Sequence, residues 1–300
     1  MSQRGTIKRY TAIIEKLQSK QRPSAQEILD YLVDLGFKIS KRTLERDFDA
    51  IRNEFGVEIT YDQSKKGYFI DEENSIDISS FLRFLEIVTT ADVLAESLSD
   101  SKESLNYVHF DQGGGFKGLK NLSIILRAIR VQKIIQFNHF SYQNKRKRSY
   151  TLHPYLLKEY QNRWYVAGWV KHVNEFRTFG LDRLSELTVC SETFKKDKKV
   201  DLTHRFDQAI GVVYGDGVTE EVRLQFNKAQ SYYIKSLPLH KSQKIILKDE
   251  DGITLTLNVV PNYELIQLIL MHNQNVKVLS PGWLVNEVKE RLINAINKYD

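Results

Sequence analysis

The sequence contains little cysteine, proline or methionine, and it has no long apolar run. Its one cysteine, Cys190, cannot form an internal disulfide, and no uncharged apolar stretch reaches the ~18 residues that a membrane span needs. The first residues, MSQRGTIKRY, lack the apolar core of a signal peptide. We therefore expect a cytoplasmic protein without a membrane partner.

The motifs of common enzyme classes are also missing. The seven histidines form no HExxH motif, one cysteine cannot build a zinc cluster, and no G-x-S-x-G elbow occurs. The triple glycine at 113–115 lacks the Gly-Lys-Ser/Thr of a P-loop, so a flexible connector is the better interpretation. Cys190 lies in a strand-like run and is expected to be a buried small side chain rather than a nucleophile. We expect no enzymatic activity, metal or cofactor.

Positive charge is concentrated in the middle of the chain. The net charge of the 300 residues is +6, yet residues 119–200 carry 17 Lys and Arg against 6 Asp and Glu. Residues 71–118 carry only 3 against 10. Such a concentration is typical of a site for an anionic partner, although a solvated surface with a lysine-rich loop explains it too.

The first 72 residues predict three helices and a hairpin. Apolar residues have helical spacing over 5–20, and Ser24 with Glu27 forms a capping box for the next helix. A third helix is expected over 40–56, between Ser40 and Gly56, and two short strands follow it. This order predicts a winged helix-turn-helix, with an ordinary helical bundle as the alternative.

In a helix-turn-helix, the N-terminal residues of the recognition helix enter the major groove. Asp47 and Asp49 would repel DNA there, unless an arginine pairs with Asp47. Lysine and arginine can meet phosphates or guanine edges, and hydroxyls can donate to phosphate. The candidate DNA-binding residues of the helix and hairpin are Ser40, Lys41, Arg42, Thr43, Arg46, Lys65, Lys66 and Tyr68.

Residues 40–47, SKRTLERD, resemble the recognition helix of DeoR-type winged-helix domains, which typically reads S-x-R-T-x-x-R-D. The resemblance covers about residues 6–70. It implies a bacterial transcription factor that binds double-stranded operator DNA.

The rest of the chain predicts an α+β multidomain protein. An acidic helix over 76–98 suits a linker or dimer element, and a helix followed by five short strands over 119–194 suggests a small bent sheet or barrel. The final hundred residues read β-α-β-β-α-β plus a helix, the ferredoxin-like order. The expected ranges are a winged helix at 1–72, a helical linker at 73–118, a ligand-sensing β-barrel at 119–200 and a ferredoxin-like extension at 201–300.

The stretch NRWYVAGW, 162–169, has a mixed basic and aromatic pattern. Alternation along a strand puts Trp164 and Val166 on one face and Arg163, Tyr165 and Trp169 on the other. We expect the first pair to face the core.

This stretch and its flanks resemble the WYL domain. The run Trp164-Tyr165-Val166 departs from Trp-Tyr-Leu only in its last aliphatic residue. His153-Pro154-Tyr155 and the downstream Phe-x-Leu-Asp-Arg-Leu pattern, 179–184, match as well. The resemblance implies an Sm/SH3-like β-fold that senses a negatively charged ligand, such as a nucleotide or oligonucleotide.

The resemblance also implies which side chains contact such a ligand. Arginines clamp phosphate and tyrosine stacks on a base. Where the family often has an arginine four residues before the proline, this chain has Tyr150, with Arg148 on the same face. Each candidate has the alternative of a surface ion pair or structural contact, above all the pair Asp182–Arg183. The candidate ligand-binding residues are Tyr142, Arg148, His153, Arg163, Tyr165, Arg177 and Arg183.

Taken together, these features predict a homodimeric transcriptional regulator whose middle domain senses an anionic ligand. The alternative is an accessory protein that holds RNA or single-stranded DNA on the basic middle domain. An enzyme acting on nucleotides is a third, less supported hypothesis.

Overall fold

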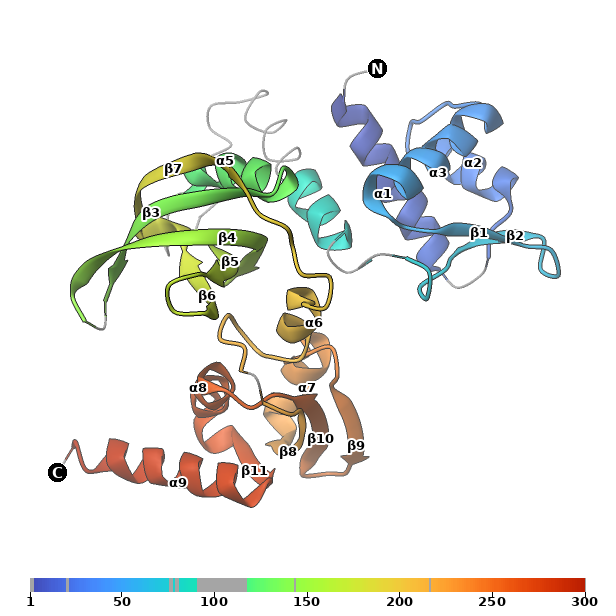
Figure 1. Ribbon diagram of the computed structural model, residues 1–300. Helices are drawn as coiled ribbons and strands as arrows, with labels where there is room; N and C mark the ends of the chain where they lie inside the picture. Colours follow the sequence, from blue (N-terminus) through green and yellow to red (C-terminus); the bar gives the residue numbers. More distant parts are fainter. Residues whose placement is uncertain are drawn as a thin grey trace, which may run out of the picture. The chain divides into compact units, whose positions relative to one another are not determined.

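The computed structural model describes residues 3–19, 22–75, 78, 81–90, 118–142, 144–215 and 217–299 (Figure 1). Internal contacts divide the chain into two units, residues 1–111 and residues 112–300. Residues 76, 77, 79, 80 and 91–98 of the predicted linker helix, and residues 99–117 after it, lie outside the described residues. Among the described residues, no helix is long and apolar enough to cross a membrane.

The first unit has the three helices and the hairpin that the sequence predicts. Ser24 and Glu27 form the expected capping box, and Gly56 ends the third helix in the left-handed conformation at φ 68°. The two strands pair antiparallel from Ile59 opposite Ile70 to Asp62 opposite Gly67. The elements are α1 (Gln3–Gln18), α2 (Ala25–Asp34), α3 (Lys41–Phe55), β1 (Ile59–Asp62) and β2 (Gly67–Ile70).

One apolar core holds this unit together. The helices contribute fully buried aliphatic side chains at helical spacing, because each is amphipathic. Residues 81–90 are helical, and Phe81 and Leu85 join the same core. The Phe55 ring lies 4.6 Å from the Phe81 ring, centroid to centroid. The start of the predicted linker helix is therefore part of the first unit's core.

The second unit begins with α5 (Leu119–Arg130) and a five-stranded antiparallel sheet. The strand order is β6-β5-β4-β3-β7, so β6 and β7 are both edges. The sequence predicts a small bent sheet or a barrel here, and in the described residues the five strands form an open sheet and no barrel. A short helix, η2 (Leu181–Arg183), connects the two edge strands and contacts β5 and β3 instead of a direct β6–β7 ladder. The strands are β3 (Lys133–Ser141), β4 (Arg146–Tyr160), β5 (Arg163–Val170), β6 (Glu175–Gly180) and β7 (Leu184–Thr193).

The two faces of this sheet are covered by different helices. On one face, Ile125 and Ala128 of α5 pack against Val166 and Val170, with Trp164 at the margin, as the alternation predicts. On the other face, α6 (Leu202–Asp207) packs Leu202 and Phe206 over Ala167. The sequence places residues 202–207 in the ferredoxin-like extension at 201–300, whereas in the structure they pack on the five-stranded sheet. The centre of β5 is consequently buried from both sides.

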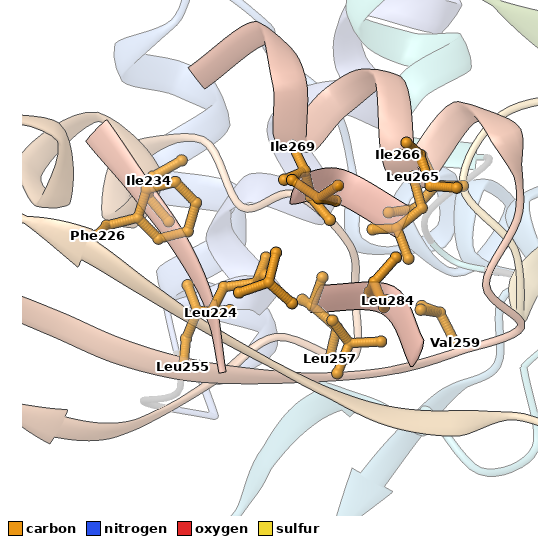
Figure 2. Packing of buried hydrophobic residues seen from close by; sticks show 14 of the residues in the cluster. Leu224, Phe226, Ile234, Leu255, Leu257, Val259, Leu265, Ile266, Ile269 and Leu284 are labelled. Atoms are coloured by element: carbon orange, nitrogen blue, oxygen red, sulfur yellow. The ribbon is translucent and has the colours of Figure 1, made fainter. Parts of the chain in front are cut away.

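The last domain has the element order that the sequence predicts. Its sheet order is β11-β8-β10-β9, all antiparallel, with the hairpin turn at Asp251-Gly252. Figure 2 shows Leu224, Phe226, Leu255 and Leu257 of the sheet facing the helical side chains, among them Leu265. The elements are β8 (Glu220–Asn227), α7 (Lys228–Ser236), β9 (Lys244–Lys248), β10 (Gly252–Val259), α8 (Tyr263–His272), η3 (Asn273–Asn275), β11 (Val276–Ser280) and α9 (Gly282–Ile296).

Cys190 differs from its expectation. It lies in β7, an edge strand of the five-stranded sheet, and it is half-buried rather than buried. Packing on only one side of an edge strand explains the difference, because the other side of the strand has no neighbouring strand to cover it.

Candidate nucleic-acid and ligand sites

Helix α3 presents a basic stripe to solvent. Lys41, Arg42 and Arg46 are all exposed, and the two arginines are four residues apart, on the same face of the helix. Ser40 caps the helix by accepting a 3.2 Å hydrogen bond from the Thr43 backbone N–H. The Ser40 and Thr43 hydroxyls also lie 3.0 Å apart. The cap therefore fixes the helix start at the residues that the sequence predicts to meet DNA.

A buried ion pair aligns α3 with α1. The Arg9 guanidinium donates to Asp47 from Nε at 2.5 Å and from Nη2 at 2.8 Å, and both side chains are buried. This hydrogen bond raises the pKa of Arg9 above its ordinary value. Asp47 is thus withdrawn from the helix surface, as the sequence analysis requires for DNA binding. Asp49 stays exposed and pairs with Arg52 at 2.9 Å.

The hairpin is anchored to the loop before α2. The Tyr68 backbone N–H donates to the Pro23 carbonyl at 2.8 Å, and Arg22 pairs with Asp62 while lying over the Phe69 ring. A Cβ on Gly67 would lie 1.7 Å from the Arg22 carbonyl oxygen, so the close approach requires glycine.

The three hairpin candidates differ in accessibility. Lys65 and Lys66 are exposed in the turn between the strands. Tyr68 is half-buried, with its ring centroid 5.0 Å from those of Phe48 and Tyr61. Burial raises the pKa of the Tyr68 hydroxyl. The lysines are therefore available to a partner, whereas the Tyr68 ring supports the hairpin against α3.

Four of the seven ligand candidates gather around one carboxylate in the second unit. Arg163 Nη1 lies 3.8 Å from Asp182 Oδ2, and Arg183 Nε lies 4.0 Å from Asp182 Oδ1. The Arg183 guanidinium also lies over the Tyr142 ring, 5.4 Å from its centroid. Tyr165, next but one to Arg163, completes the group. We call Tyr142, Arg163, Tyr165, Asp182 and Arg183 the basic cluster.

Strand register and a glycine position this cluster. Tyr165 of β5 is paired with Gly180 of β6, directly before η2. A Cβ on Gly180 would lie 2.6 Å from Asp182 Oδ1 and 3.0 Å from Arg183 Nε. Gly180 therefore lets the chain turn so that Asp182 and Arg183 lie against the start of β5.

Burial and charge act together on the ionisable groups here. Burial raises the pKa of the Tyr165 hydroxyl, while Arg163 and Arg183 act in the opposite direction. Burial lowers the pKa of His139 to about 4, with Arg183 adding to the effect. His139 Nε2 is buried and has no hydrogen-bond partner among the described residues. The imidazole is consequently neutral at pH 7 beside a cationic surface.

His139 is a residue that the sequence analysis missed as a site candidate. What marks His139 as part of the site is its position in β3, where it pairs with Arg148 of β4 and Leu184 of β7. That register becomes visible only after the strands are aligned. Asp182 is a second case, because the sequence analysis considers it only as a partner of Arg183.

The other three candidates lie elsewhere on the same sheet. Arg177 donates to Glu175 Oε2 at 3.1 Å from Nε and at 2.8 Å from Nη2. His153 stacks on Phe194 with ring centroids 4.8 Å apart, and burial lowers its pKa. Arg148 is exposed and lies across from His139. The seven candidates thus do not form one site.

Among the described residues, no group of three or more His, Cys, Asp and Glu side chains is arranged to hold a metal ion. What the cluster can do chemically is to bind anions. Two guanidinium groups share one carboxylate at long distances, so most of their donors remain for a ligand, and two tyrosine rings lie beside them.

Comparisons with known proteins agree with the division of the second unit. A family model described as the WYL domain matches residues 120–189, and one described as the WCX domain matches residues 219–296. A comparison with curated proteins returns no match.

Two solved structures are similar to the chain at low identity. "Proteasome accessory factor B/C (PafBC) of Arthrobacter aurescens" is 17% identical with a TM-score of 0.32, over 97% of this chain and 46% of that chain. "Crystal structure of a CRISPR Cas-related protein" is 13% identical with a TM-score of 0.38, over 99% of this chain and 85% of that chain. Within this chain, a stretch similar to the WYL domain is followed by a stretch similar to the WCX domain.

Proposed function

We propose that this protein is a transcriptional regulator that binds double-stranded operator DNA through α3. The observation that carries the proposal is the exposed pair Arg42 and Arg46 on a helix whose Asp47 is buried against Arg9. Three helices and a hairpin with exposed Lys65 and Lys66 suit a winged helix-turn-helix of the DeoR type. A homodimer reading two half-sites would supply the specificity that one such domain lacks.

The WYL domain is the proposed sensor in this protein. Its basic cluster offers arginine donors and tyrosine rings to an anionic ligand, which we take to be a nucleotide or oligonucleotide. Such a ligand would change operator binding only through its different affinity for the two states of the regulator. We assign no catalytic role to the chain.

The test is fluorescence anisotropy with labelled duplex DNA from immediately upstream of the protein's own gene. A scrambled duplex and a single strand run beside it, each across a salt series. We expect preference for the upstream duplex at physiological salt. Equal, steeply salt-dependent binding to all three DNAs would reflect backbone electrostatics alone and would contradict the proposal.

Paired variants locate the binding surface. Replacing Arg42 and Arg46 with alanine should weaken binding of the upstream duplex at least ~10-fold, since each phosphate or base contact is worth ~1 kcal/mol or more. The control replaces the exposed Arg223 and the half-buried Arg291 of the WCX domain, and removes the same charge. Equal loss in both double variants would place the DNA elsewhere.

A second candidate function is an accessory protein that holds RNA or single-stranded DNA. The basic cluster is the observation that favours it, because arginines beside tyrosine rings suit unpaired bases. Preferential binding of the single strand, lost when Arg163 and Arg183 become glutamine and kept when residues 1–70 are removed, would favour this function over operator binding.

A further inference from the structure

The first two turns of α3 present an acidic side chain beside the basic ones. Arg42, Glu45 and Arg46 are exposed there, whereas Asp47 is buried in its ion pair with α1. Among the described residues, no hydrogen bond or ion pair holds the Glu45 carboxylate, although Arg42 lies only three residues away along the helix. An open carboxylate on the surface that meets DNA requires a reason, because the DNA backbone is itself anionic.

The other carboxylates beside Glu45 are neutralised by an arginine. A cavity of about 440 Å³ between α3 and the hairpin has Glu45, Asp49, Arg52 and Glu58 in its lining. Arg52 pairs with Asp49 Oδ1 and with Glu58 Oε2, at 2.9 Å in each case. Of these three carboxylates, Glu45 is the one whose oxygens both remain available to accept hydrogen bonds from a partner.

Double-stranded DNA offers a carboxylate few partners. Phosphates repel it, and in the major groove guanine and thymine present only acceptors to a hydrogen-bonding side chain. The donors there are the amino groups of cytosine and adenine. Adenine places the acceptor N7 beside its amino group, whereas cytosine presents its amino group without a neighbouring acceptor. A carboxylate in the major groove therefore favours cytosine and rejects guanine and thymine.

The two arginines beside Glu45 have the complementary preference. A guanidinium donates two hydrogen bonds to O6 and N7 of guanine, or it contacts a phosphate. Residues three positions apart on a helix lie side by side, so Arg42 and Glu45 can reach the two bases of one pair or of neighbouring pairs. A surface that bound phosphates alone would gain from a third cation at position 45, whereas a surface that reads a C·G pair gains from a carboxylate.

We propose that Glu45 is a specificity-determining residue, which accepts a hydrogen bond from the amino group of a cytosine in the major groove of the operator. This inference rests on the proposed binding of operator DNA by α3, and it adds which base the helix selects. Arg42 and Arg46 supply affinity through phosphates and guanines. Glu45 supplies discrimination, because the carboxylate penalises every base that lacks a donor at that position.

The experiment is the selection of duplexes from a randomised DNA library by the full chain, followed by anisotropy with the selected duplex and its single-pair variants. Replacing the cytosine read by Glu45 with guanine should weaken binding at least ~5-fold, and Glu45→Ala should abolish this preference. Glu45→Gln should select adenine there, since a carboxamide can bond both N6 and N7. Glu54→Gln, which removes an exposed carboxylate from the last turn of α3, is the matched control and should select the original sequence.

Failure of this proposal is distinct from failure of operator binding. If the unchanged protein selects no sequence, operator binding fails and the role of Glu45 fails with it. If the selected sequence depends on Arg42 and Arg46 but is the same for a folded Glu45→Ala variant, operator binding stands and Glu45 reads no base. Equally tighter binding of all duplexes by Glu45→Ala would mean that the carboxylate only repels the backbone, which also refutes the proposal. Circular dichroism checks that each variant is folded.

Discussion

Two arginine–aspartate arrangements in this protein have the same chemistry and different surroundings. In the first unit, Arg9 and Asp47 form two hydrogen bonds of 2.5 and 2.8 Å, and their side chains are 5% and 7% exposed. In the stretch that matches the WYL domain, Asp182 is 16% exposed and lies 3.8 Å from Arg163 and 4.0 Å from Arg183, which are 51% and 25% exposed.

The difference shows what burial and geometry do to an ion pair. A buried bidentate pair uses the donors of its arginine and cannot lose a partner without leaving an unpaired charge. A long contact between partly exposed groups contributes less to stability and leaves the donors free to exchange partners. We infer that the first arrangement maintains the fold and that the second serves a ligand.

The largest expected effect comes from breaking the buried pair. Asp47→Ala should lower the free energy of unfolding of the first unit by about 3 to 5 kcal/mol, because the Arg9 charge stays buried without its partner. Urea denaturation followed by circular dichroism measures it. Asp49→Ala, on the same helix but exposed, is the control. Similar losses in both variants would mean that burial does not distinguish the pairs.

A smaller effect, on the pH dependence of stability, tests whether His139 beside the basic cluster is shielded from water. The pKa of His139 in the fold is about 4, below its ordinary 6.5, so the unfolded chain takes up this proton first as pH falls. The contribution of His139 to stability is therefore present above pH 6.5 and is lost as pH falls towards 4, by roughly 2 kcal/mol after allowance for partial exposure.

His139→Phe should remove that part of the pH dependence. Burial also lowers the pKa values of His153, His240 and His272, so the parent protein loses stability in acid for several reasons and the variant should lose less. Urea midpoints at pH 7.5 and pH 4.5 give the comparison. An unchanged pH dependence in the variant would show that His139 is solvated.

The third test removes the carboxylate that Arg163 and Arg183 share. Asp182→Asn should raise the affinity for a labelled single-stranded oligonucleotide up to about fivefold, because the arginines lose a competing anion worth ~1 kcal/mol or less. The unfolding free energy should change by less than about 1 kcal/mol. Glu221→Gln removes an exposed carboxylate paired with Arg223 and should leave affinity unchanged. Weaker oligonucleotide binding in Asp182→Asn would assign Asp182 a positioning role instead.

The smallest expected effect concerns a pair at the surface, whose side chains are 49% and 67% exposed. Lys147 and Glu186 are bonded across the sheet, and this contact lowers the pKa of Glu186. Because water screens both groups, Glu186→Gln should leave the thermal midpoint unchanged within error. A clear fall would show that exposed pairs in this sheet are structural after all.

Local patterns in the sequence were sufficient for the elements and some of their ends. The capping box at Ser24, the cap at Ser40 and the left-handed Gly56 depend on residues within a few positions of each other, so a short segment specifies them. The same holds for the inward face of Val166, which follows from alternation along a strand.

The site was harder to predict, because its parts come from distant segments. Nothing local links Arg9 with Asp47, 38 residues away, or brings Tyr142 to Arg183. The choice between an open sheet and a barrel, and the docking of α6 on the sheet, were out of reach for a similar reason, since strand closure and helix docking depend on how faces pack.

By itself, therefore, the sequence determined the order of helices and strands, the basic character of residues 119–200 and the exposed arginines of α3. The tertiary structure alone decided which of seven ligand candidates share a carboxylate, and that α6 covers Ala167 at the centre of β5. The physical reason is the separation of the interacting residues along the sequence, because caps and periodicity are set by neighbours in the chain. Register, docking and burial are set by contacts that form only when the whole domain packs.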